Sequence, residues 1–114
     1  MKRDSLVFLQ DILDSIIAID KYVEGVSLTD FLGNQQLQDS VVRRFEIIGE
    51  AAKNIGDSIR EKGPTIPWKK IAGLRDVLIH AYFGIDLIRI FEAIQKDLPP
   101  LKDKISEIIL EEKK

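Results

Sequence analysis

The residues of this sequence with the clearest chemical potential lie in the run from Leu74 to Tyr82. Arg75 carries a permanent charge, His80 is the only histidine and titrates near neutrality, and Tyr82 adds a phenolic hydroxyl. On a helix the three side chains span about two turns. A cation, a proton-transfer group and a hydroxyl in this arrangement suit chemistry on phosphates.

Arg75 falls on the apolar side of its predicted helix. That face is shared by Trp68, Ile71, Ala72, Leu78, Ile79 and Tyr82. An unpaired buried guanidinium is costly, so we expect a partner, either Asp76 beside it or Glu46 or Glu50 on the preceding long helix. One alternative is an ion pair that only stabilises the bundle, and the other is a guanidinium that binds phosphate bidentately.

His80 does not converge with Arg75 on a straight helix. Five residues of ideal helix turn by about 500°, which leaves the two side chains about 140° apart. Either the helix bends or ends near His80, or the pair meets its counterpart across a symmetric dimer. A two-fold axis here would bring two arginines and two histidines into one cleft, which then holds both an acid and a base.

Simpler structural roles exist for each of these residues. A histidine at a helix end is often inert, and Tyr82 is typical of a boundary aromatic with a wet hydroxyl. Glu46 and Glu50 are like charges four residues apart, which is unfavourable without a nearby cation. We interpret them as members of structural ion pairs with Arg43, Arg44, Lys53 or Arg75, in preference to magnesium ligands.

Composition restricts the class of protein. With 114 residues, of which 45% are hydrophobic and 32% charged, the sequence predicts a single folded domain over residues 1–114. The chain has no cysteine and one histidine, which excludes disulfides, thiol catalysis and the usual zinc sites. Charges interrupt every apolar run, so we expect no signal peptide, no membrane span and a cytoplasmic location.

Charge is distributed unevenly along the chain. Residues 41–75 carry a net charge of +4, whereas residues 1–40 carry −4 and residues 76–114 carry −2. The basic excess leads into the Arg75 run, so Lys69, Lys70 and Arg43 are candidate RNA-binding residues. The alternative is that these cations only solvate a helix face.

Hydrophobic periodicity predicts an all-α fold. We expect a helix over 5–23 with a stop at Gly25, then a short turn capped by Ser27 and ending near Gly33. A long helix follows from about Gln36 to Ile55, closed by Gly56, and then a short helical piece around Ile59.

The second half of the chain continues this pattern. The loop 63–67 precedes a helix that begins with Pro67, and the residues 83–86 end it and cap the next, which runs to Leu98-Pro99-Pro100. A final helix carries Leu101 and Ile105. The short connections predict an up-and-down antiparallel bundle of four main helices plus short helical pieces.

Three segments in order resemble the HepT-like toxins of the HEPN superfamily. They are the Arg75-x4-His80-x-Tyr82 pattern, the run from Pro67 to Asp76 and the run from Phe45 to Ala51. The resemblance spans nearly the whole chain and implies a homodimeric, all-helical, metal-independent ribonuclease without a cofactor, the toxin of a prokaryotic type VII-like toxin–antitoxin pair. It implies that Arg75 and His80 are catalytic and that Asp76 supports them.

The same resemblance implies a partner. The cognate antitoxin would be a minimal nucleotidyltransferase that uses ATP to attach AMP to Tyr82. The toxin homodimer and the antitoxin could form a higher assembly. The RNA substrate, tRNA or mRNA, is not indicated. From a different class, the alternative is a non-catalytic HEPN module that binds a nucleotide or a nucleotidyltransferase, and a third reading is a plain dimerisation domain.

Overall fold

The computed structural model describes residues 5–73 and 87–114, and these residues form helices joined by short loops, with no strand among them. Residues 68–73 are helical as well. The other helices are α1 (Ser5–Val23), α2 (Leu28–Leu32), α3 (Gln35–Lys53), α4 (Asp57–Lys62), α6 (Leu87–Lys96) and α7 (Leu98–Glu112). The predicted all-α fold is confirmed.

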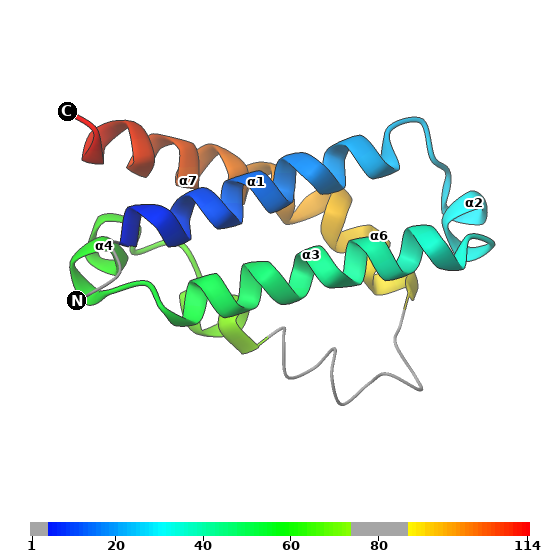
Figure 1. The fold of residues 1–114 in the computed structure, drawn as a ribbon, viewed down its shortest axis with the longest axis horizontal. Helices are drawn as coiled ribbons and strands as arrows, with labels where there is room; N and C mark the ends of the chain where they lie inside the picture. The colour runs from blue at the N-terminus through cyan, green and yellow to red at the C-terminus, as the bar shows by residue number, and fades with distance from the viewer. Residues whose placement is uncertain (1–4, 74–86) are drawn as a thin grey trace.

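The long helices lie side by side in alternating directions. Figure 1 shows α1 and α3 running antiparallel along the length of the molecule, with α7 beside α1 and again reversed. Helix α6 packs against α7 and the short α2. This is the expected up-and-down arrangement, and it follows from short connections between amphipathic helices.

The connection between α1 and α2 agrees with the sequence analysis. Gly25 has a φ of +70°, in the left-handed region that glycine adopts without steric cost. The Ser27 hydroxyl oxygen accepts a hydrogen bond from the Asp30 amide at 3.1 Å and caps α2. Ser27 therefore acts as the predicted cap.

Helix α3 ends earlier than the sequence indicated. It stops at Lys53 with Asn54 as the cap, and Gly56 instead precedes α4. Asn54 Nδ2 donates to the Glu50 carbonyl oxygen at 2.8 Å, while the Arg60 guanidinium donates to the carbonyl oxygens of Ala52 and Ile55. These donors satisfy carbonyls that the next helical turn would otherwise have used.

Two helix starts also differ from the prediction. Helix α7 begins at Leu98, so Pro99 and Pro100 lie in its first turn, where the missing amide hydrogens would have had no helical partner. The 68–73 helix begins one residue after Pro67, whose carbonyl oxygen accepts from the Ile71 amide at 3.0 Å. The prolines correctly predicted that a helix begins near each of them, but the observed first residues, Trp68 and Leu98, differ from the predicted ones by one to three positions.

One apolar cluster runs through the bundle and joins all the elements. Its fully buried members are Leu9, Ile12, Ile16, Ile19, Phe31, Val41, Ala52 and Ile105. Ser15 is also fully buried, and its hydroxyl has no hydrogen-bond partner among the residues described. In the described part of the core, burial has therefore removed this hydroxyl from water without giving it a partner.

Polar contacts connect α7 to the rest of the chain. Lys102 Nζ lies 3.2 Å from an Asp20 carboxylate oxygen on α1, and Lys62 of α4 pairs with Glu112. The hydrogen bond that the Lys62 ammonium donates to the Glu112 carboxylate raises the pKa of Lys62 above its ordinary value. Within the part of the chain that the structure describes, no helix is both long and apolar enough to cross a membrane.

Candidate active site

The predicted catalytic pair lies outside the described residues. Arg75, His80, the supporting Asp76 and the modified Tyr82 all fall within 74–86, as do the predicted helix end and cap at 83–86. Their roles stay predictions. The structure does describe the 68–73 helix and α6 on either side of this segment in the sequence, and helix α3.

The residues before the motif are tied to the core by Trp68. Its side chain is 6% exposed, and the indole Nε1 donates to the Gly63 carbonyl oxygen at 3.1 Å. Ile71, one turn later, is also buried. A large ring with a satisfied N–H fixes both the position and the rotation of the helix that leads into Arg75.

The residues after the motif are tied down in a similar way. Helix α6 starts at Leu87 and buries Phe91 and Ile94. The rings of Phe91 and Phe31 lie 5.3 Å apart between centroids and are inclined by 39°. Aromatic pairs of this geometry add stabilisation beyond the apolar area they bury. The two described elements that flank residues 74–86 in the sequence are therefore both anchored in the core.

Helix α3 carries the two predicted carboxylates. Glu46 pairs with Arg43, with 3.4 Å between Nη1 and Oε2, and the Arg43 side chain is 70% exposed. Such a pair contributes little to stability because water screens it. Glu50 lies one turn further along and is exposed. Whether either carboxylate faces Arg75 lies outside the described residues.

The three candidate RNA-binding cations lie on two elements. Lys69 and Lys70 are exposed on the 68–73 helix, directly before the motif, and Arg43 is exposed on α3. All three side chains are accessible to a polyanion. The charge of Arg43 is partly neutralised by its ion pair with Glu46.

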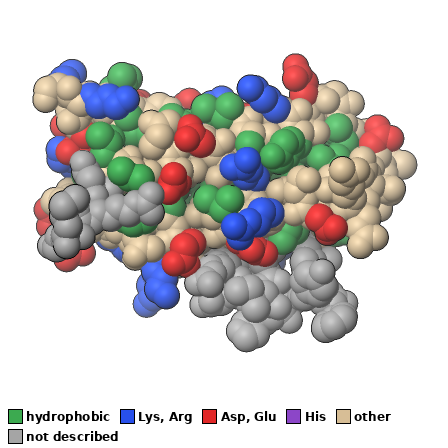
Figure 2. Space-filling model, viewed as in Figure 1, with side chains coloured by type: hydrophobic (Ala, Val, Ile, Leu, Met, Phe, Trp, Pro, Cys, Tyr) green, Lys and Arg blue, Asp and Glu red, His purple; other side chains and the backbone are tan. Residues whose placement is uncertain are grey.

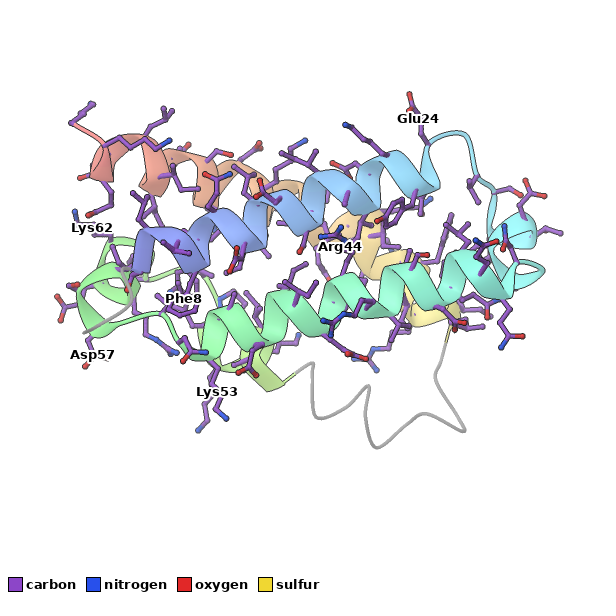
Figure 3. The ribbon with its side chains drawn as sticks, viewed as in Figure 1. Phe8, Glu24, Arg44, Lys53, Asp57 and Lys62 are labelled. Atoms are coloured by element: carbon purple, nitrogen blue, oxygen red, sulfur yellow. The ribbon has the colours of Figure 1, made fainter. Side chains whose placement is uncertain are left out.

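Two other cations of the basic segment 41–75 make contacts that stabilise the fold. Arg60 closes the end of α3 through two carbonyl oxygens, and Lys62 pairs with Glu112. Lys53 is exposed and projects away from the bundle at the end of α3 (Figure 3). The net charge of +4 over 41–75 thus overstates how much of it is available to bind a ligand.

The face formed by α1 and α3 offers no continuous basic track. Figure 2 shows basic and acidic side chains interspersed over this face. A single-stranded polyanion binds best along a groove of one sign. The lysines next to the motif are therefore better candidates for RNA contact than the α1 and α3 face.

Magnesium ligation is the alternative role for Glu46 and Glu50. Across residues 5–73 and 87–114, no group of three or more histidine or carboxylate side chains is placed to hold an ion. Two carboxylates on one helix are few for a dedicated metal site. The described residues therefore give no support to the magnesium alternative.

A cavity of about 260 Å³ was not predicted from the sequence. It lies between α3, residues 65–71, α6 and α7, and its wall combines apolar side chains with Lys70, Asp97 and Lys104. These residues are distant in the sequence and follow no motif. Only the packing of the helices brings them together.

The relatives of this chain decide its family. A family profile described as ribonuclease HepT-like matches residues 12–108, which include Arg75, His80 and Tyr82. The chain belongs to the HepT-like ribonuclease family. The resemblance seen in the sequence, to the HepT-like toxins of the HEPN superfamily, is thereby confirmed.

Three curated relatives illustrate the family. A protein of Thermococcus cleftensis named "Probable ribonuclease HepT" is 40% identical over 108 residues, which cover 95% of this chain and 98% of the relative. A Methanocaldococcus jannaschii protein named "Putative RNase" is 40% identical over 104 residues, 91% of this chain and 95% of the relative. Both match this HepT-like chain over nearly their whole length.

The third relative is longer. It is a Methanocaldococcus jannaschii protein named "Gamma-glutamylcyclotransferase and putative RNase", 46% identical over 111 residues. The match covers 97% of this chain but 50% of the relative, so the HepT-like chain spans about half of that protein. No solved structure gave a significant match.

Proposed function

We propose that this HepT-like chain is a metal-independent endoribonuclease, the toxin of a prokaryotic toxin–antitoxin pair of the type VII kind, acting in the cytoplasm. The observation that carries the proposal is the family match over residues 12–108, because it includes the whole Arg75 to Tyr82 motif. The name of the Thermococcus cleftensis relative, a probable ribonuclease HepT, supports the same activity.

In the proposed reaction His80 takes the proton from a ribose 2′-hydroxyl. The 2′ oxygen attacks the adjacent phosphorus, the bond from phosphorus to the 5′ oxygen breaks, and the leaving oxygen receives a proton. The products are a 2′,3′-cyclic phosphate and a 5′-hydroxyl end. General base assistance contributes about a hundred- to ten-thousandfold in rate. Arg75, held in place by Asp76, stabilises the charge that builds on the phosphate oxygens.

We propose a homodimer in which two copies share one cleft. A two-fold axis supplies a second histidine to act as the acid while the first acts as the base. Mixing the original chain with an excess of His80→Ala chains tests this arrangement. A shared cleft that needs both histidines predicts inactive mixed dimers, so cleavage falls below the share of original chains in the mixture, whereas separate active sites would keep cleavage proportional to that share.

We further propose that a minimal nucleotidyltransferase silences the toxin at Tyr82. The phenolic oxygen attacks the α-phosphorus of ATP, a phosphorus–oxygen bond forms, and pyrophosphate leaves. The added phosphate carries negative charge two residues from His80 and repels RNA from the cleft. The Tyr82→Phe chain should stay active in the presence of the partner and ATP, because it lacks the acceptor oxygen.

The activity itself is tested with purified protein, RNA of defined sequence and a chelator. We expect cleavage that survives the chelator and is lost in the His80→Ala variant, which should remain folded by circular dichroism. Cleavage that stops on chelation contradicts the metal-independent mechanism. No cleavage by either protein, with nucleotidyltransferase binding retained, would favour a non-catalytic binding module.

A further inference from the structure

The cavity beside the 68–73 helix has an apolar floor. Phe45 and Ile48 of α3, Ile71 and Leu98 form it, and each of these side chains is no more than 7% exposed. The volume of about 260 Å³ lies below the range of about 300–1,000 Å³ typical of drug-sized ligands. The cavity therefore fits a small flat group better than a large ligand or a helix.

The rim of the cavity is polar and mostly cationic. Lys70 and Lys104 contribute two ammonium groups, and Lys104 Nζ lies 2.7 Å from the Thr65 hydroxyl oxygen, which holds it at the edge. Asp97 contributes one carboxylate, and its side chain makes no capping hydrogen bond to α7. The cavity thus offers a hydrophobic interior, two cations and one free acceptor.

We propose that this cavity holds one unpaired nucleobase of the RNA substrate, with Lys70 and Lys104 on the flanking phosphates. A nucleotide combines a flat, weakly polar ring with an adjacent anion, and this matches the floor and the two lysines. Single-stranded RNA is commonly bound in this way, with bases out of the stack and the backbone on cations. The inference rests on the proposed ribonuclease function and adds a subsite to it.

Asp97 gives the subsite a preference among bases. Its carboxylate accepts hydrogen bonds from amino groups, as acidic residues do from the N4 amino group of cytosine. Uracil has no exocyclic amino group, and its N3–H donor lies between two carbonyl oxygens, which a carboxylate repels. The subsite should therefore favour cytosine over uracil.

The position of Lys70 connects this subsite to the motif. Lys70 lies on the cavity wall and on the 68–73 helix, five residues before Arg75 in the sequence. A strand seated in the cavity is held by the element that leads into the predicted catalytic residues. The subsite would then select which linkage is presented for cleavage.

Binding of short 2′-O-methyl RNA tests the proposal without cleavage, because the attacking hydroxyl is blocked. Affinities for cytosine and uracil oligomers are measured by fluorescence anisotropy at two salt concentrations. Ala93→Leu fills the cavity from α6, Lys104→Gln removes one cation, and Asp97→Asn removes the carboxylate. Lys102→Gln is the matched control, since Lys102 is on the same helix but pairs with Asp20.

We expect Ala93→Leu to weaken binding of the cytosine oligomer by roughly fivefold or more. Lys104→Gln should weaken both oligomers and reduce the salt slope by about one, and Lys102→Gln should change neither. Asp97→Asn should abolish the preference for cytosine. Melting curves of all four variants check that each remains folded.

Two results would overturn the subsite. They are unchanged RNA affinity in Ala93→Leu and equal binding of cytosine and uracil oligomers by the original protein. If the unchanged affinity of Ala93→Leu comes with a lower mass in solution, the cavity holds a second copy of the chain instead. The two proposals fail separately. If the protein cleaves RNA but the variants bind RNA as the original does, only the subsite proposal is contradicted. If the protein binds RNA with base preference but does not cleave it, only the ribonuclease proposal is contradicted.

Discussion

Trp68 Nε1 donates a hydrogen bond to the carbonyl oxygen of Gly63, 3.1 Å away and inside the core. This bond joins the end of the 63–67 loop to the helix that leads into Arg75. We expect Trp68→Phe to lower the free energy of unfolding by about 1–3 kcal/mol, since it removes this hydrogen bond and packed atoms while the Gly63 oxygen keeps its bond from the Ile66 amide at 3.0 Å. Urea unfolding measures the change, and an unchanged midpoint would show that the bond contributes nothing.

Gly63 itself has no space for a side chain. A Cβ atom there would lie 2.8 Å from Ile66 Cδ1 and 3.0 Å from Ile108 Cδ1, and all three residues are buried. We expect Gly63→Ala to destabilise the chain by about 1–3 kcal/mol through overpacking.

Gly73 provides the matched control for that substitution. A Cβ atom at Gly73 meets nothing within 4 Å among the described residues, so Gly73→Ala should stabilise the helix by about 0.4–1 kcal/mol. Thermal melts of the two variants should therefore move in opposite directions. A shift of the same sign in both would contradict the packing described at Gly63.

Ser15 is the buried polar group without a partner among the residues described. We expect Ser15→Ala to raise the free energy of unfolding by about 1 kcal/mol more than Ser40→Ala does. Ser40 is partly exposed, and its hydroxyl donates to the Gln36 carbonyl oxygen at 2.9 Å. Both changes gain the same helix propensity, so their difference isolates the buried hydroxyl. Equal effects would mean that the Ser15 hydroxyl is satisfied.

Arg60 stabilises the fold and is not available to RNA. Its guanidinium donates to the Ile55 and Ala52 carbonyl oxygens at 3.0 and 3.1 Å. We expect Arg60→Met to cost about 1.5–3 kcal/mol of stability while RNA affinity, measured well below the melting temperature, stays the same. Arg43→Gln should show the reverse pattern, because Arg43 is exposed and its pair with Glu46 is weak.

Periodicity and turn residues predicted most of the fold. The helix over 5–23, the stop at Gly25 and the Ser27 cap were predicted correctly. Each of these features depends on interactions between residues close together in the sequence. The end of α3 could not be predicted because it depends on Arg60, which reaches back from the next helix. Tertiary hydrogen bonds leave no periodic pattern.

The candidate site likewise has one part that the sequence predicted and one part that it did not. The motif residues were found from their chemistry and from family resemblance, because they are close together in the sequence. The cavity with Lys70, Asp97 and Lys104 was not predicted, because two elements far apart in the sequence, the 68–73 helix and α7 with its cap, bring those side chains to one place. Asp97 in particular has the sequence signature of an ordinary helix start.

The central claim is that Arg75 and His80 cleave RNA through the ribose 2′-hydroxyl. Mass spectrometry of the RNA ends, after reaction in the presence of a chelator, tests it most directly. We predict 2′,3′-cyclic phosphate and 5′-hydroxyl ends from the original chain, and intact RNA from the His80→Ala and Arg75→Ala variants. Products that end in a 3′-hydroxyl, or cyclic ends that persist in the His80→Ala variant, would contradict the mechanism.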